Sequence, residues 1–154
     1  MARRRAATAA LLALVASLSA GCGMSVSTRE SRYGGKLSAL QRTYEASTDG
    51  VLRSAAPGSD RARAAAAVGS YETILAGVQT ALRRLHAPPQ ASPLHRRLER
   101  TLTRYSGEVR RLIAALAVPR RVDARDATRR FAGVTQGTRA QVRSTIAAID
   151  TRVR

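Results

Sequence analysis

Few side chains in this sequence of 154 residues are of the types that do chemistry. It has one cysteine, Cys22, and two histidines, His86 and His95, which flank the Pro88-Pro89 pair. A metal site needs clustered histidine, cysteine or carboxylate ligands, and neither histidine has a carboxylate beside it in the sequence. The Glu-x-x-His pattern of metal-binding helical bundles is also absent. We therefore expect helix-end histidines that pack or are solvated, and no metal or cofactor.

Patterns of enzymatic catalysis are missing as well. No G-x-S-x-G turn presents a nucleophilic serine, and no paired carboxylates stand in a polar break where a cleft could form. Gly34-Gly35 is not followed by the Gly-Lys-Ser or Gly-Lys-Thr of a phosphate-binding loop. The sequence therefore predicts that the protein is not an enzyme.

The strongest chemical signal is positive charge. The chain has 27 lysine and arginine residues against ten acids, a formal charge of +17, and Lys36 is its only lysine. In the segment 93–118 the apolar residues form one stripe at helical spacing, and a row of arginines falls on the opposite face. We call this row the basic ridge, and it consists of Arg96, Arg100, Arg104 and Arg111, with Arg97 and Arg110 beside it.

A positive ridge attracts anionic surfaces, so five arginines are candidate anion-binding residues. The alternative is a solvated face without a specific ligand. A chain with this much positive charge suggests nucleic-acid binding. We do not expect that partner, because we expect no aromatic residue among these arginines on which bases could stack. The expected partners are therefore anionic phospholipid or wall polymer. The candidate residues are Arg96, Arg97, Arg100, Arg104 and Arg111.

The first 22 residues have the layout of a bacterial export signal. Arginines at 3–5 precede an uncharged stretch at 6–20, which is shorter than the roughly 20 apolar residues of a membrane-spanning helix. The sequence LSAGC at 18–22 then resembles the lipobox of bacterial lipoproteins, although Ser19 stands where that motif usually has leucine. This resemblance implies that the chain is cut before Cys22 and that the Cys22 thiol is acylated.

Other destinations stay open from the sequence. Ordinary secretion would leave Cys22 an incidental thiol, an uncleaved signal would be an anchor, and export could follow the general or the twin-arginine route. We expect an extracytoplasmic protein attached to the bacterial cell membrane by lipid, or alternatively a secreted one. Removal of residues 1–21 takes away three arginines and no acid, which leaves a formal charge of +14.

Four segments show the three- and four-residue apolar spacing of amphipathic helices, and proline-containing breaks separate them. The first is the weakest, because its stripe includes Ser47 and because Thr48, Asp49 and Gly50 lower its helix propensity. We expect Ser59-Asp60, Ser92 and Asp123 to begin the other three, with Ser59 as the cap of the second helix and Asp60 as an acid in its first turn. The predicted helices cover about 36–55, 60–86, 93–118 and 123–153.

Amphipathic segments with short connections pack as antiparallel neighbours. We therefore predict an all-α protein, an up-down-up-down four-helix bundle over residues 36–154. A three-helix bundle with a loosely packed first helix is the alternative. Residues 1–21 form the predicted lipoprotein signal peptide. Residues 22–35 form the acylated cysteine and a flexible tether, because small polar residues and a glycine pair favour a flexible chain.

The chain as a whole also resembles small actinobacterial lipoproteins and secreted helical-bundle proteins. The resemblance rests on LSAGC at 18–22 and on a helical hairpin around Pro88-Pro89, and it implies a helical fold and export but no activity. We expect a non-enzymatic, lipid-anchored envelope protein that has a structural or binding role. The alternatives are a protein-interaction or regulatory subunit of an envelope complex, and a carrier of a small ligand.

Overall fold

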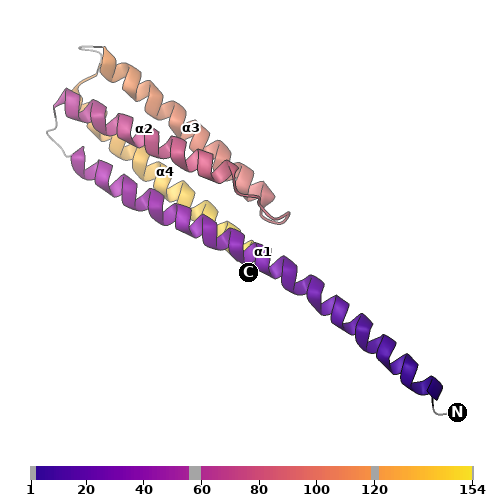
Figure 1. The fold of residues 1–154 in the computed structure, drawn as a ribbon. Helices are drawn as coiled ribbons and strands as arrows, with labels where there is room; N and C mark the ends of the chain where they lie inside the picture. Colours follow the sequence, from indigo (N-terminus) through magenta and orange to yellow (C-terminus); the bar gives the residue numbers. More distant parts are fainter. Residues whose placement is uncertain (1–2, 56–59, 119–121, 154) are drawn as a thin grey trace.

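The computed structural model describes residues 3–55, 60–118 and 122–153, with side chains from residue 28 onward. These residues form four helices and no strand, which confirms the all-α prediction. Figure 1 shows the helices lying side by side, with α1 extending well beyond the other three. The helices are α1 (Arg3–Ser54), α2 (Arg61–Arg83), α3 (Ser92–Ala117) and α4 (Ala124–Val153).

The helices form the predicted up-down-up-down bundle. Consecutive helices are antiparallel neighbours, and α4 closes the ring by packing against α1 (Figure 1). Helix α1 places Tyr33, Leu37 and Tyr44 in the core, and none of these side chains is more than 5% exposed. The first helix is therefore an integral part of the bundle, and the alternative in which it is loosely attached is wrong.

The predicted flexible tether differs from the structure. Helix α1 is continuous through residues 23–35, and the buried Tyr33 places its hydroxyl 2.9 Å from Nδ1 of His95 on α3. The pair Gly34-Gly35 lowers helix propensity by about 1 kcal/mol per residue relative to alanine. Packing of Tyr33 and Leu37 against the other helices outweighs that cost, because tertiary contacts routinely override propensity.

Two of the three helix starts lie at or next to the predicted residues, but Asp60 is itself the cap of α2 and not an acid of its first turn, and Ser59, the predicted cap, lies outside the described residues. The Asp60 carboxylate accepts a hydrogen bond from the backbone N–H of Arg63 at 2.8 Å, and Asp123 accepts one from that of Arg125 at 2.7 Å. Each bond satisfies a donor that the first turn of a helix would otherwise leave without a partner.

The predicted cap at Ser92 is wrong. Ala91 occupies the cap position of α3 without a side-chain bond, while the Ser92 hydroxyl accepts a bond from the Arg96 guanidinium at 2.8 Å. The turn after the prolines replaces the cap, because the carbonyl of Pro88 accepts the N–H groups of both Ala91 and Ser92 at 3.0 Å.

A polar layer crosses the middle of the core. The hydroxyls of Tyr44 and Tyr71 lie 2.8 Å apart, and the Phe131 ring meets Tyr71 edge-on with centroids 5.5 Å apart. Thr48 is fully buried beside this layer, whereas Ser47, which the sequence placed on the stripe, is exposed. The stripe of α1 therefore continues from Tyr44 with a step of four residues. Burial raises the pKa values of both tyrosines, so both hydroxyls stay protonated.

Arg61, at the start of α2, binds both the C-terminal end of α3 and the residue Val122, which precedes α4. Its guanidinium donates to the carbonyls of Leu116 and Val122 at 2.9 Å each, and also to those of Ala115 and Val118. The last carbonyls of a helix have no partner within the helix and carry its negative pole. An arginine of α2 thus caps the end of α3 and also binds the carbonyl of Val122, just before α4.

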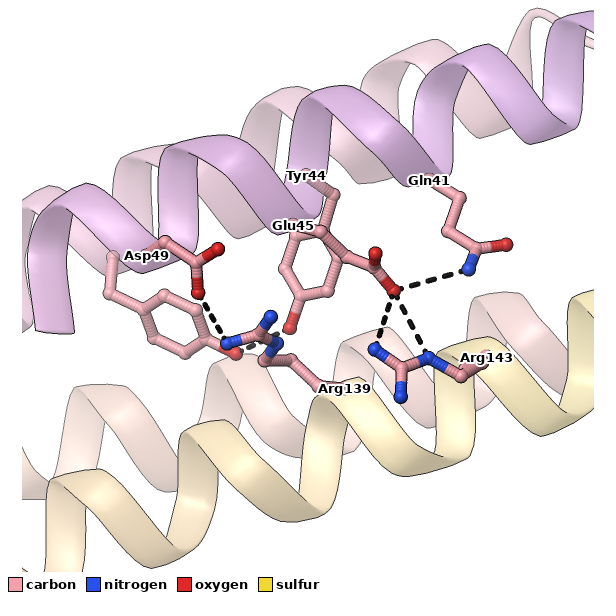
Figure 2. A network of polar contacts seen from close by, with 7 residues as sticks. Gln41, Tyr44, Glu45, Asp49, Arg139 and Arg143 are labelled. Atoms are coloured by element: carbon pink, nitrogen blue, oxygen red, sulfur yellow. Dashed lines mark hydrogen bonds and ion pairs between the residues drawn. The ribbon is translucent and has the colours of Figure 1, made fainter.

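The contact between α1 and α4 is the α1–α4 seam, which Figure 2 shows from close by. Arg139 of α4 pairs with Asp49 of α1 at 2.6 Å, and Arg143 pairs with Glu45 at 3.1 Å. Gln41 also donates to Glu45 at 3.1 Å. Partial burial alone would raise the pKa of Glu45, but the bonds from Gln41 and Arg143 hold that pKa below its ordinary value.

Candidate anion-binding groove

The structure places all the candidate arginines of the basic ridge on the exposed face of α3. Among the residues with described side chains, none of them forms an ion pair with a carboxylate. Arg110, beside the ridge, does form one, with Glu72 of α2 at 2.7 Å. The side chains free of acidic partners are Arg96, Arg97, Arg100, Arg104 and Arg111.

The ridge divides into two parts. Arg104 and Arg111 border an open hollow between α3 and α4, which we call the α3–α4 groove and which has a volume of about 620 Å³. Arg96, Arg97 and Arg100 lie nearer the start of α3 and do not line it. The residues that line the groove are Arg104, Tyr105, Glu108, Arg111, Leu112, Ala115, Arg130, Gly133, Val134 and Gly137.

Arg130 of α4 belongs to the site although the sequence interpretation did not include it. It faces Arg104 and Arg111 across the groove, so three guanidinium groups from two helices border one hollow. The groove also contains one acid, Glu108, which forms no ion pair with any of the three in the described residues. Three cations against one carboxylate leave a net positive field in the groove.

Two glycines of α4 make room for the groove. A Cβ on Gly137 would lie 3.1 Å from the hydroxyl of Tyr105, so that ring lies directly over the glycine. A Cβ on Gly133 would meet nothing within 4 Å, so the floor is open there. The spacing of Arg130, Gly133 and Gly137 puts them on one side of α4. This spacing is the sequence signal that could have pointed to the groove.

Tyr105 corrects the expectation that no aromatic residue stands among the arginines. The Arg104 guanidinium lies 4.8 Å from the centroid of the half-buried Tyr105 ring, a cation–π contact. On the other side, the Arg111 Nε donates to the carbonyl of Gly107 at 3.3 Å. Both contacts restrain side chains that would otherwise be mobile, so less freedom is lost when an anion binds.

The two histidines have separate environments. His86 is exposed, whereas His95 is 7% exposed, with Tyr33 on Nδ1 and Glu99 3.7 Å from Nε2. Burial lowers the pKa of His95, and the nearby Glu99 only partly opposes that shift. In the part of the chain with described side chains, no three potential ligands come together to hold a metal ion.

Cys22 lies on the helical backbone of α1, but its side chain falls outside the described side chains. Its acylation therefore stays a prediction. Over the same described residues, no helix combines the length and the apolar character needed to cross a membrane.

No protein-family model, curated protein or solved structure matches this chain.

Proposed function

We propose that the protein is a non-enzymatic lipoprotein of the bacterial cell envelope that binds an anionic wall polymer in the α3–α4 groove. The observation that carries this proposal is the convergence of Arg104, Arg111 and Arg130 on one open groove, where none of them pairs with an acid among the described side chains. Guanidinium groups bind phosphate and carboxylate through paired N–H donors, so repeating anionic groups along a polymer suit them.

The lining of the groove favours a polymer over a simple ion. Tyr105, Leu112 and Val134 give it apolar surface between the charged borders. A chain of sugar or polyol units offers C–H faces to such surface and anionic groups to the arginines. The groove runs between two long antiparallel helices and is open to solvent, so a linear ligand can enter and leave it lengthwise.

The position of the groove favours wall polymer over the anchoring bilayer. Figure 1 shows that the N-terminal part of α1 extends beyond the bundle and that α3 starts at that end. The proposed anchor, Cys22, precedes Tyr33, the first buried residue of α1 among the described side chains. Arg104 follows Ser92, the first residue of α3, by twelve residues, or about 18 Å of helix. That distance exceeds the Debye length of about 8 Å at physiological salt, so the bilayer attracts the groove only weakly.

Sedimentation with cell-wall material tests the binding. Purified full-length protein in neutral detergent is mixed with insoluble wall material at low and high salt. We expect binding that salt weakens, and a loss of about tenfold or more in affinity when Arg104, Arg111 and Arg130 are all changed to Gln.

Two matched variants separate the groove from general charge. Changing Arg42, Arg53 and Arg152 to Gln removes three exposed charges elsewhere and should leave most of the binding. Gly133→Gln fills the groove without changing the charge and should weaken binding. Equal losses in both triple variants would contradict a groove site. Binding that resists salt but falls on an apolar substitution such as Leu112→Ala would favour a protein partner instead.

The anchor is tested separately. Cys22→Ala should release the protein from membranes or stop its processing, because the acylated thiol is the proposed attachment. Normal cleavage with continued membrane attachment in fractionated cells would contradict the lipoprotein assignment.

A further inference from the structure

A second group of cations lies at the other end of the bundle, away from the α3–α4 groove. Three of them, Arg29, Arg32 and Lys36, project from α1, and Arg84 with His86 follows the end of α2. Together they border a pocket of about 340 Å³, which we call the α1–α2 pocket. A volume of this size lies within the range of about 300–1,000 Å³ that small-molecule sites occupy.

The floor of the α1–α2 pocket is built by buried contacts. Tyr33 lines the pocket, yet it is only 5% exposed, and its hydroxyl lies 2.9 Å from Nδ1 of the buried His95 on α3. On the neighbouring side of α1, Glu30 accepts a hydrogen bond from Gln90 in the turn between α2 and α3. These two contacts hold α1 against the α2–α3 turn, so the cations keep their relative positions.

The charged residues that line the pocket are all basic. No acidic residue lines it, and none of its four permanent cations belongs to an ion pair in the part of the chain with described side chains. The carbonyl end of α2 would by itself disfavour an anion there. Arg84, at the cap of α2, offsets that negative pole, which leaves the three cations of α1 to attract a ligand.

The pocket is lined by residues of α1 and by residues that follow α2. Figure 1 shows that α1 leaves the bundle at the end where α2 finishes. Cys22 precedes Arg29 by seven residues of the same helix, which is about 10 Å along its axis. At the proposed anchor position, Arg29 therefore comes within about one to two Debye lengths of the headgroups at physiological salt, whereas Lys36, fourteen residues after Cys22, lies about 21 Å along the axis. The α3–α4 groove lies much farther along the bundle.

We propose that the α1–α2 pocket binds the phosphate of an acidic phospholipid headgroup. Arg29, Arg32 and Lys36 supply the charge, Arg84 closes the opposite side, and the half-buried Leu85 offers apolar surface to the start of an acyl chain. The membrane location rests on the proposed lipid anchor, whereas phosphate recognition rests on the pocket itself. A bound headgroup would be a second attachment beside the acylated cysteine, which stable membrane association generally needs.

Calorimetric titration of the full-length protein in neutral-detergent micelles tests this site. The probes are short-chain phosphatidylglycerol, short-chain phosphatidylcholine as the zwitterionic control, and free glycerophosphate. We expect saturable binding of phosphatidylglycerol and much weaker binding of phosphatidylcholine. The change of Arg32 and Arg84 together to Gln should weaken the phosphatidylglycerol affinity by about 25-fold, or about fivefold for each cation.

A charge-matched pair completes the experiment. Changing Arg42 and Arg53 to Gln removes the same charge from exposed positions that line neither the pocket nor the groove, and should alter phosphatidylglycerol binding by less than about twofold. Equal losses in the two pairs would overturn the site, as would equal binding of the two lipids or no binding at all. Thermal melting of each variant verifies that it is folded.

Glycerophosphate identifies the source of the phosphate. If it binds as tightly as the lipid and with the same dependence on Arg32 and Arg84, the pocket recognises free phosphate esters, and the lipid assignment is overturned. If it binds more weakly than phosphatidylglycerol, the acyl chain contributes, and the lipid assignment is supported. Sedimentation with wall material should be unaffected by the Arg32 and Arg84 changes, so failure of this inference and failure of the wall-polymer function are distinguishable.

Discussion

Helix α4 presents arginines to both of its ring neighbours, with opposite outcomes. Towards α1, Arg139 and Arg143 meet Asp49 and Glu45 and form the α1–α4 seam (Figure 2). Towards α3, Arg130 lines an open groove with two further arginines and with Glu108, which forms no ion pair among the described residues. The helix that faces α4 supplies carboxylates on one side and further arginines on the other, and this difference decides whether an arginine of α4 forms an ion pair or stays available to a ligand.

The largest expected effect concerns Arg61, whose guanidinium donates to four backbone carbonyls. Arg61→Ala should lower the free energy of unfolding by about 2–3 kcal/mol, because the last carbonyls of α3 and that of Val122 lose charge-assisted hydrogen bonds. Arg63→Ala, two residues away and exposed, is the matched control and should change it by less than about 0.5 kcal/mol. Denaturant titration measures both, and similar losses would contradict the capping role of Arg61.

The two sides of α4 can be compared directly. Arg139→Gln should cost about 1 kcal/mol of stability, because Arg139 is 23% exposed and its removal leaves Asp49 without its partner. Arg130→Gln should cost less than about 0.5 kcal/mol. Wall-polymer binding should show the reverse order, with the larger loss for Arg130→Gln. A loss of stability for Arg130→Gln equal to that for Arg139→Gln would mean that the groove side is structural as well.

The glycines of the groove provide a smaller test. Gly133→Ala should stabilise the protein by about 0.5–1 kcal/mol, because alanine has the higher helix propensity and its Cβ meets nothing within 4 Å. Gly137→Ala should gain less, since its Cβ would press on the Tyr105 hydroxyl at 3.1 Å. Thermal melting compares the two variants. A gain at Gly137 as large as that at Gly133 would show that Tyr105 moves aside freely.

The smallest effect is the acid dependence of the seam. The pKa of Glu45 is held below its ordinary value of 4.5, so on acidification the unfolded chain takes up this proton before the folded protein does. The stability from Glu45 is therefore fully present above about pH 4.5 and is lost as the pH falls through the lower folded pKa. Glu45→Gln should flatten this part of the profile in denaturant titrations at successive pH values. If the slope of the unfolding free energy against pH is the same in this variant, Glu45 does not contribute to the acid dependence of stability.

The helices were predictable from the sequence because their apolar spacing is regular. The boundaries of α2, α3 and α4 differ from the predicted ones by at most a few residues. The helical conformation of residues 23–35 was not predictable in the same way. Gly34-Gly35 favours a flexible chain locally, and only the contact of Tyr33 with His95, 62 residues away, favours the helix.

The site was predictable only in part. The exposed arginines of α3 follow from the helical period, but Arg130 joins them only through the register between α3 and α4. The clamp made by Arg61 had no sequence signal at all, since its acceptors are backbone carbonyls that every residue carries. Interactions within one helix are thus visible in a sequence, whereas interactions that depend on how two helices are aligned are not.

The unbroken course of α1 has a mechanical consequence. A flexible tether would let the bundle swing through a wide range of positions above an anchor, with each orientation of the groove visited only briefly. A continuous helix from Cys22 into the core is instead a rigid connection between the two. If Cys22 is the proposed lipid anchor, this helix fixes the distance between the anchor and the bundle, and the groove between α3 and α4 is held at one height above the membrane.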